Sequence, residues 1–271
     1  MDSLFNVEKK VAVITGGMGQ LGMAYSLAFV ERGAKVAILD MAKSPKEPNA
    51  AFDKAMQDGQ LVNYVCNIVS RDEVESVLQL IEKQFGAPHI LVNNAALDFP
   101  PNASADEVGP FENYPESSYD KVMEVNVKGT FICCQVIGGR MAQLGRGAIV
   151  NISSTYGILS PCQDIYEFRR KNDNVFYKPV AYSISKSAIL NLTRYLATYW
   201  AKKGVRVNTL TPGGIANNQP EEFLEAYCPR VPMGRMAEAK EMVGAVIYLA
   251  SDAASYVTGT NLVVDGGWSA W

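Results

Sequence analysis

The chain has 271 residues, of which 48% are apolar and 20% charged, the balance of a globular protein that can bury a core without disulfides or metals. Its formal net charge of −3 argues against a nucleic-acid-binding protein, which normally carries a basic face. No apolar run reaches the roughly 18 residues that cross a bilayer, and the first ten residues lack the features of a secretory signal. We therefore expect a cytoplasmic protein with neither a membrane nor a nucleic acid as partner.

The five cysteines and the single histidine do not have the paired spacing of a zinc site, so no metal is expected. Cys66, Cys133 and Cys134 lie in apolar runs and are interpreted as small core residues. His89 stands at the start of an apolar strand, which argues against a Cys–His catalytic pair. Any chemistry is therefore expected from Tyr, Ser, Lys or Asp side chains, or from a bound cofactor.

Short β-branched runs alternate with longer amphipathic segments along the whole chain. This alternation predicts an α/β fold: a single doubly wound Rossmann-type domain over residues 1–271, with a seven-stranded parallel sheet and helices on both faces. The site should lie beyond the carboxyl ends of the strands. Strands are predicted at 11–15, 35–39, 61–66, 90–92, 148–152, 206–210 and 262–264, and helices near 21–32, 50–58, 71–85, 118–141, 181–203 and 239–251.

Residues 97–117 and 156–179 form connections too long for ordinary turns, and with residues 214–229 they are expected to form a substrate pocket. Their many polar side chains favour a hydroxyl-rich substrate over a steroid or a fatty-acyl chain. The alternative is that these side chains only solvate the surface of the loops. The polar set is Asp98, Asn102, Asp106, Glu112, Asn113, Gln163, Asp164, Glu167, Asn217, Asn218 and Gln219.

Two other features of these loops have two interpretations each. Tyr156 and Tyr166 are among several aromatic residues that could stack on a sugar ring or a base. The basic run 169–171, Arg-Arg-Lys, could clamp a phosphate or a carboxylate, or it could be a solvated face.

Residues 15–22, Thr-Gly-Gly-Met-Gly-Gln-Leu-Gly, directly follow the first strand and lead into a helix. Glycine is needed there because the chain turns sharply and its backbone must approach a pyrophosphate, which the free N–H groups of the helix then bind. The context predicts a dinucleotide site rather than a simple structural turn. From this loop we expect Gly16, Gly19, Gln20 and Leu21 to bind the cofactor.

Asp40 ends the second strand, 18 residues after Gly22, where a carboxylate can accept hydrogen bonds from both hydroxyls of the adenosine ribose. The same carboxylate would repel the 2′-phosphate of NADP. Lys43 is close enough to compensate, but a solvated role is preferred for it. We therefore predict NAD as the cofactor.

The helix after the second long loop begins with Tyr182, and Lys186 lies one turn later on the same face. A nearby ammonium stabilises a phenolate, which should lower the pKa of Tyr182 toward the working pH of a general acid–base. Tyr199 and Lys203 share the spacing but lie near the far end of the helix. Ser154, after the fifth strand, can donate a hydrogen bond to a carbonyl oxygen on which charge develops.

With these residues in place, the chain resembles the short-chain dehydrogenase/reductase family over essentially its full length. The family's Tyr-x-x-x-Lys pair and strand-end serine match Tyr182, Lys186 and Ser154. Its other motifs are matched by Asn126 on the preceding long helix, by Asn93-Asn94-Ala95-Ala96 after the fourth strand, by Pro212-Gly213 after the sixth, and by Asp265-Gly266-Gly267 near the carboxyl end.

The resemblance implies a role for each residue. Tyr182 would exchange a proton with the substrate oxygen, and Lys186 would bind the nicotinamide ribose and lower the tyrosine pKa. Ser154 would orient the substrate oxygen, and Asn126 would hold a water in the proton relay. Asn67 and Ile68 would bracket the adenine, Ile215 would offer its backbone to the carboxamide, and Asn94, Ala95, Ala96, Pro212 and Gly213 would complete the cofactor site.

The chain departs from the family pattern at several positions. Gln20 stands where the common loop has glycine, so the glycine spacing is that of the nucleotide-sugar-modifying branch. Asn67 replaces an aspartate and Ala96 a glycine. Ser154 and Tyr182 are 28 positions apart, about twice the usual separation, so residues 160–179 must loop out over the crevice if the serine assignment is to hold.

The favoured function is therefore an NAD-dependent dehydrogenase or ketoreductase of a sugar, sugar acid or nucleotide sugar. The alternatives are a dehydrogenase of a non-sugar alcohol, a nucleotide-sugar epimerase or dehydratase that retains its NAD, and a non-catalytic NAD-binding protein. The chain looks closest to bacterial oxidoreductases of flagellin-modification and surface-sugar pathways. The family also implies a homo-oligomer, a tetramer or dimer formed through the helices at 118–141 and 181–203.

Overall fold

The computed structural model describes residues 3–98, 105–170 and 175–271. Its central sheet has the strand order β3-β2-β1-β4-β5-β6-β7, and all six neighbouring pairs are parallel. All seven predicted strands are confirmed, with ends that differ from prediction by at most two residues. They are β1 Val11–Thr15, β2 Lys35–Asp40, β3 Leu61–Val65, β4 Ile90–Asn93, β5 Gly147–Ile152, β6 Val205–Pro212 and β7 Asn261–Val264.

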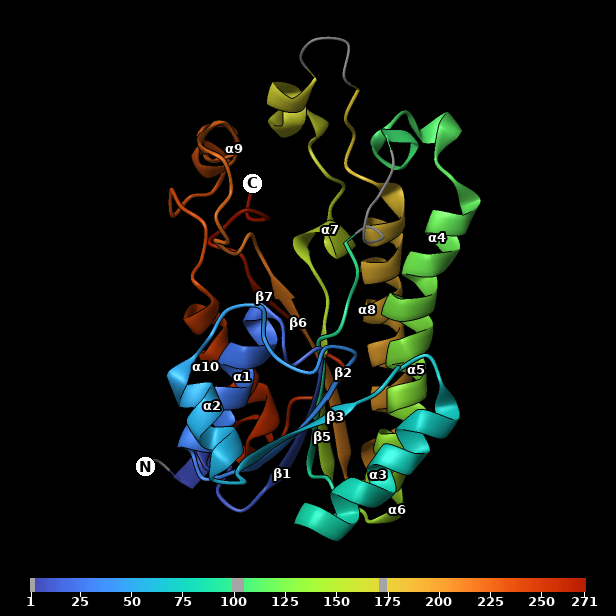
Figure 1. Ribbon diagram of the computed structural model, residues 1–271, viewed down its shortest axis with the longest axis vertical. Coiled ribbons are helices and arrows are strands. Elements are labelled where there is room, and N and C mark those ends of the chain that lie inside the picture. The colour runs from blue at the N-terminus through green and yellow to red at the C-terminus, as the bar shows by residue number, and fades with distance from the viewer. Residues whose placement is uncertain (1–2, 99–104, 171–174) are drawn as a thin grey trace.

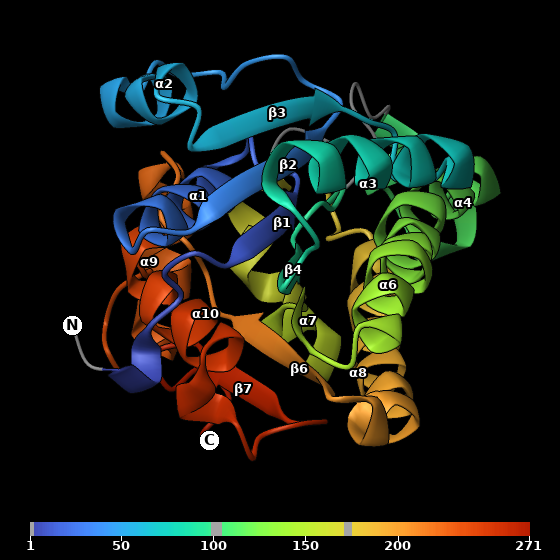
Figure 2. The same cartoon turned by 90° about the horizontal axis from the view of Figure 1, so that it is seen from below.

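Helices cover both faces of this sheet, as the alternation predicts. Figure 2 shows α1, α2 and α10 on one side and α3, α4, α6 and α8 on the other. The covering helices are α1 Gln20–Glu31, α2 Ala50–Gln57, α3 Arg71–Phe85, α4 Glu116–Met123, α5 Thr130–Cys133, α6 Gly139–Gln143, α8 Val180–Trp200 and α10 Val243–Ala250. None of the described helices is both long and apolar enough to cross a membrane.

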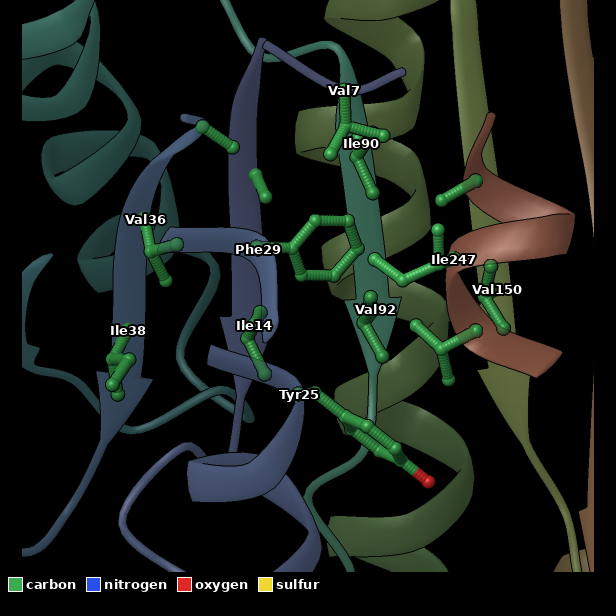
Figure 3. Packing of buried hydrophobic residues seen from close by; sticks show 14 of the residues in the cluster. Val7, Ile14, Tyr25, Phe29, Val36, Ile38, Ile90, Val92, Val150 and Ile247 are labelled. Carbon is green, nitrogen blue, oxygen red and sulfur yellow. The ribbon is translucent and has the colours of Figure 1, made fainter. Parts of the chain in front are cut away.

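Successive side chains of each strand enter two separate cores, because neighbouring residues of a strand point to opposite faces. In β1, Ile14 packs beneath α1 and α10, whereas Val13 packs beneath α3 and α8. Figure 3 shows the first core, where Phe29 of α1 and Ile247 of α10 lie over the sheet. Burial on both faces explains why the strands read as continuous apolar runs.

The three cysteines expected in the core are buried there. Cys66, Cys133 and Cys134 all belong to the second core, and burial raises the pKa of each thiol. Within the described residues no group of three or more His, Cys, Asp or Glu side chains could hold a metal ion.

The long helix predicted at 118–141 runs from Glu116 to Gln143 but contains two π-helical segments, Glu124–Gly129 and Cys134–Gly138. Short π-helical insertions often mark functional positions, because they rotate side chains out of the regular helical register. The first segment contains Asn126, one of the predicted site residues.

Long connections extend beyond the carboxyl ends of the strands, at the top of Figure 1. Sequence reasoning missed the short elements within them, α7 Thr155–Ile158, α9 Glu221–Tyr227 and a 3₁₀ segment at Gln163–Arg169. Of the predicted pocket residues, Asn102 and Lys171 lie outside the described residues. The chain crosses over between β1 and β4, whose outward connections diverge, and this is where open α/β sheets place their ligands.

Candidate active site

The glycines of the loop after β1 fall into two groups. Gly16 has a positive φ of 65°, and a Cβ there would lie 2.7 Å from Cα of Ala95. A Cβ on Gly22 would lie 2.2 Å from the carbonyl oxygen of Gly16, so the fold itself requires both residues. Gly19 is different, because a Cβ there would meet only the Gly16 oxygen, at 3.5 Å. Packing leaves space at Gly19, the N-cap of α1, and this space suits a pyrophosphate close to the helix N-terminus.

Thr15 organises this loop, a role the sequence reasoning missed. Its buried hydroxyl accepts hydrogen bonds from the backbone N–H groups of Asn94 and Ala95, both at 3.0 Å. The Asn94 amide in turn donates to the carbonyls of Thr15 and Gly16, at 3.2 and 3.0 Å. Asn94 and Ala95 therefore support the glycine loop from behind. A polar residue at the end of an otherwise apolar strand was the available signal.

Asp40 lies at the end of β2, directly beside the glycine loop. Its Oδ2 accepts from the backbone N–H of Met18 at 2.9 Å and its Oδ1 from that of Ala42, also at 2.9 Å. These bonds fix a carboxylate next to the loop, as the predicted ribose contact requires. Lys43 is exposed and forms no ion pair among the described residues.

Asn67 and Ile68 follow β3, and their side chains differ in exposure. The Asn67 side-chain oxygen accepts from Val69 N–H at 3.3 Å, and its half-buried amide group lies at the strand end. Ile68 is only 6% exposed, and a Cβ on Gly129 would lie 2.7 Å from its δ-methyl group. The Ile68 side chain thus packs in the core and leaves little surface at the strand end, so the bracketing of the adenine by Asn67 and Ile68 stays a prediction.

Ser154, Tyr182 and Lys186 meet in one cavity of about 400 Å³ at the carboxyl ends of the strands. Ser154 caps α7, Tyr182 and Lys186 lie in the first two turns of α8, and a hydrogen bond joins the Ser154 and Tyr182 side chains. Most of the long insertion between them therefore folds outward, as the serine assignment requires. The lining includes Leu21, Asn94, Ala96, Asp98, Ser154, Tyr156, Tyr166, Lys178, Tyr182, Lys186, Pro212, Gly213, Ile215 and Gln219.

The electrostatics of this pair differ from the expectation. Burial raises the pKa of Tyr182, and the charge of Asp98 raises it further, whereas the Ser154 hydrogen bond lowers it. The predicted lowering by Lys186 is therefore not what this structure has, because the loss of water around the phenol dominates. Burial also lowers the pKa of Lys186 to about 8, and its ammonium donates to the Ile152 carbonyl at 2.9 Å.

The Asn126 side chain makes its hydrogen bonds to other groups of the protein. Its amide group bonds both backbone groups of Leu97, accepting from the N–H at 2.7 Å and donating to the carbonyl at 2.8 Å. It also donates to the Ser185 hydroxyl at 2.9 Å. The side chain thereby ties the segment after β4 to α8, beside the Tyr182 turn.

The segment after β6 is joined to the glycine loop by Gln20, whose amide donates to the Ala216 carbonyl at 2.6 Å. This contact accounts for the side chain that replaces the family's usual glycine. Gly213 donates to the Val264 carbonyl at 2.9 Å, and the Ile215 carbonyl accepts from Gln219 at 2.9 Å.

The outer wall of the cavity is aromatic. The Tyr156 and Tyr166 hydroxyls lie 3.0 Å apart, and Tyr227 stacks on Trp268 with ring centroids 4.5 Å apart. Arg169 and Arg170 both contact the second long loop. Arg170 donates to two loop carbonyls, and the Arg169 guanidinium lies 3.7 Å from the Phe176 ring centroid. These contacts favour a structural role over a phosphate clamp.

Comparison with known proteins is consistent with this geometry. Residues 18–269 match a family model described as enoyl-(acyl carrier protein) reductase. An NAD-dependent glycerol dehydrogenase of Listeria innocua is 32% identical, over 99% of this chain and 97% of its own. A short chain dehydrogenase of Leptospira borgpetersenii with bound NAD⁺ superposes with a TM-score of 0.84 at 31% identity, over 97% of this chain and 94% of its own. The chain belongs to the short-chain dehydrogenase/reductase family.

Other members of the short-chain dehydrogenase/reductase family extend the comparison. The D-arabinitol 2-dehydrogenase (ribulose-forming) of Scheffersomyces stipitis is 34% identical, over 98% of this chain and 96% of its own. A gluconate 5-dehydrogenase of Burkholderia cenocepacia, solved with NADP and tartrate, superposes with a TM-score of 0.82 at 26% identity, over 99% of this chain and 98% of its own. Solved members of the same fold thus contain NAD⁺ in one case and NADP in the other.

Proposed function

We propose that this protein is an NAD-dependent dehydrogenase that interconverts a secondary alcohol and a ketone on a polyol or sugar. The observation that carries this proposal is the meeting of Ser154, Tyr182 and Lys186 in one cavity beside the glycine loop, despite the long insertion between them. Relatives that act on glycerol and D-arabinitol support the substrate class.

Burial favours the neutral phenol of Tyr182, which is the form that donates a proton to the ketone oxygen in reduction. In the oxidation direction Tyr182 must first lose its phenolic proton, and its phenolate then accepts the proton of the substrate hydroxyl as the carbinol carbon loses a hydride. Ser154 holds the substrate oxygen, and its hydroxyl stabilises the charge that develops there. Lys186 places a cation beside the phenol, and Asn126 fixes the adjoining backbone through its side chain. A water held at Asn126 in the proton relay stays a prediction. The bound dinucleotide supplies the hydride acceptor, or the donor in reduction.

NAD rather than NADP is the proposed cofactor. Asp40 is held beside the glycine loop by two backbone N–H groups, where its carboxylate would accept the ribose hydroxyls and repel a 2′-phosphate. The exposed Lys43 is left to solvent. The proposed cofactor-binding set is Gly16, Gly19, Gln20, Leu21, Asp40, Asn67, Ile68, Asn94, Ala95, Ala96, Tyr182, Lys186, Pro212, Gly213 and Ile215, with Ile68 contributing through its backbone.

A dehydrogenase of a non-sugar alcohol is the second candidate, and the aromatic wall of Tyr166, Phe223 and Tyr227 favours it. The same cavity also has polar groups, which favour a hydroxylated substrate. These are the side chains of Asp98 and Lys178 and the paired hydroxyls of Tyr156 and Tyr166. The narrower resemblance to flagellin-modification and surface-sugar oxidoreductases stays a prediction, as does an epimerase or dehydratase activity.

This function is tested with a panel of polyols, aldonates, nucleotide sugars and simple alcohols. Each compound is assayed for NADH formation from NAD and, in parallel, for NADPH formation from NADP. We expect turnover with at least one polyol, and a kcat/KM for NAD well above that for NADP. Turnover confined to simple alcohols would replace the proposal with its alternative, and preference for NADP would contradict the role of Asp40.

We also propose that the chain is one cytoplasmic domain that forms a homodimer or homotetramer through α8 and the long helix that begins with α4. These helices expose Phe131, Tyr195 and Tyr199, which line two neighbouring grooves. Patches of large apolar side chains on a surface commonly mark interfaces. Light scattering at micromolar concentration should give at least twice the 29.5 kDa chain mass; the mass of a monomer would contradict the assembly.

A further inference from the structure

Asp98 and Lys178 come from the two long loops and meet as an ion pair on the wall of the Tyr182 cavity. The Lys178 side chain is only 11% exposed, and its ammonium lies 5.5 Å from the centroid of the Tyr182 ring. The Lys178 backbone N–H donates to the side-chain oxygen of Gln163 at 2.9 Å, which fixes the end of the insertion. Lys178 is therefore a fixed part of the pocket beside Tyr182, and it holds the Asp98 side chain, which is 44% exposed, on the cavity wall.

Asp98 retains an unused acceptor in this arrangement. Its Oδ2 accepts from Lys178, but its Oδ1 is buried and has no hydrogen-bond partner among the described residues. A buried carboxylate oxygen without a donor costs free energy, and buried polar atoms are usually paired with protein, water or a ligand. Because an ionised carboxylate can only accept, any partner of this oxygen must be a donor, such as a hydroxyl group.

We propose that Asp98 and Lys178 bind a hydroxyl group on a carbon near the reacting carbinol, and that they thereby select uncharged polyols over sugar acids. This inference rests on the proposed dehydrogenase function and narrows its substrate class. A hydroxyl both donates and accepts, so it can donate to Asp98 and accept from Lys178 at once. A carboxylate on the same carbon has no proton for Asp98 and would bring two anions together, which discriminates by repulsion.

The negative charge of Asp98 reaches the whole pocket. It raises the pKa of Tyr182 and Lys186, and also those of Tyr156 and Tyr166 on the outer wall. The cavity lining also holds two cations, Lys178 and Lys186, so the repulsion of a carboxylate is confined to the part of the cavity beside Asp98. The discrimination therefore depends on the substrate group that lies against Asp98 itself.

The test compares wild type with Asp98→Asn, using arabinitol and its aldonate, arabinonate, as the two substrates. The variant leaves the Lys178 ammonium without its anion, so the ratio of kcat/KM for arabinitol to that for arabinonate should fall roughly 10- to 100-fold. Asp252→Asn is the matched control, because it removes the carboxylate of the exposed Lys10–Asp252 pair, outside the cavity lining. A substrate that is not turned over is measured as a competitive inhibitor.

Melting temperatures show whether Asp98→Asn folds. If it does not, Lys178→Met is an independent second variant for the same test. This variant leaves Asp98 unopposed, so discrimination against arabinonate should increase. A wild type that prefers arabinonate, or a ratio that stays the same in both pocket variants, overturns the inference while leaving a dehydrogenase in place. A wild type that turns over no polyol in the panel contradicts the proposed function itself.

Discussion

Replacing Tyr182 by phenylalanine should lower kcat about 10³-fold, because the variant loses the group that exchanges a proton with the substrate oxygen. Phenylalanine keeps the ring, so the core of the site and the fold should persist. The only side-chain hydrogen bond lost with the hydroxyl among those described is the one with Ser154. Steady-state rates of NADH formation on the best polyol, together with melting temperatures, measure the effect.

Tyr199→Phe is the matched control for this change. Tyr199 has the same four-residue spacing to Lys203, and the Lys203 ammonium lies 5.2 Å from its ring centroid. Tyr199 is 57% exposed, near the far end of α8. Phenylalanine keeps the aromatic ring that Tyr199 offers to the proposed oligomer interface, so we expect the activity of this variant to match that of wild type. Equal losses in the two variants, or a Tyr182→Phe enzyme with undiminished kcat, would remove Tyr182 from the mechanism.

Gly22→Ala should be the most damaging substitution in the cofactor loop. The added Cβ would lie 2.2 Å from the Gly16 oxygen and 2.6 Å from Cα of Gly17, both of which are backbone atoms. The loop must move away from α1, and we expect this to lower the free energy of unfolding by about 3 kcal/mol. Because the moved loop is the proposed pyrophosphate cradle, the Kd for NADH should rise at least about 100-fold, since two lost backbone hydrogen bonds to a charged group suffice for that.

Gly244→Ala tests whether any glycine-to-alanine change in a helix has this effect. A Cβ at Gly244, in α10, would meet nothing within 4 Å. Alanine should therefore stabilise the fold there by roughly 0.5–1 kcal/mol and leave the Kd for NADH unchanged. Urea unfolding and NADH fluorescence titration separate the two variants. A Gly22→Ala protein with wild-type NADH affinity would contradict the cradle.

The strands were predictable because burial on both faces makes them short continuous apolar runs, and the covering helices because burial of one face gives them an amphipathic period. The glycine loop, Asp40 and the Tyr182–Lys186 pair were predictable because each is recognised from residues close to it in the sequence. The 3₁₀ segment Gln163–Arg169 was not, since tertiary contacts such as the Tyr166–Phe223 packing hold it. The Asp98–Lys178 pair was not either, because 80 positions separate residues that only the fold brings together.

The pKa of Tyr182 shows a second limit of the sequence. Its distance along the chain from Lys186 predicts a cation nearby, and that cation is 5.7 Å from the ring centroid. The sequence does not reveal how completely the pocket removes water from the phenol, and this desolvation decides the direction of the shift.

Deuterium transfer tests the central claim most directly. Arabinitol carrying deuterium on its reacting carbinol carbon is incubated with the enzyme and NAD, and the reduced dinucleotide is examined by mass spectrometry. The proposed function predicts one deuterium on the nicotinamide of each NADH formed, with an equal amount of ketose lacking that deuterium. NADH without deuterium, or a rearranged sugar formed without any NADH, would contradict it.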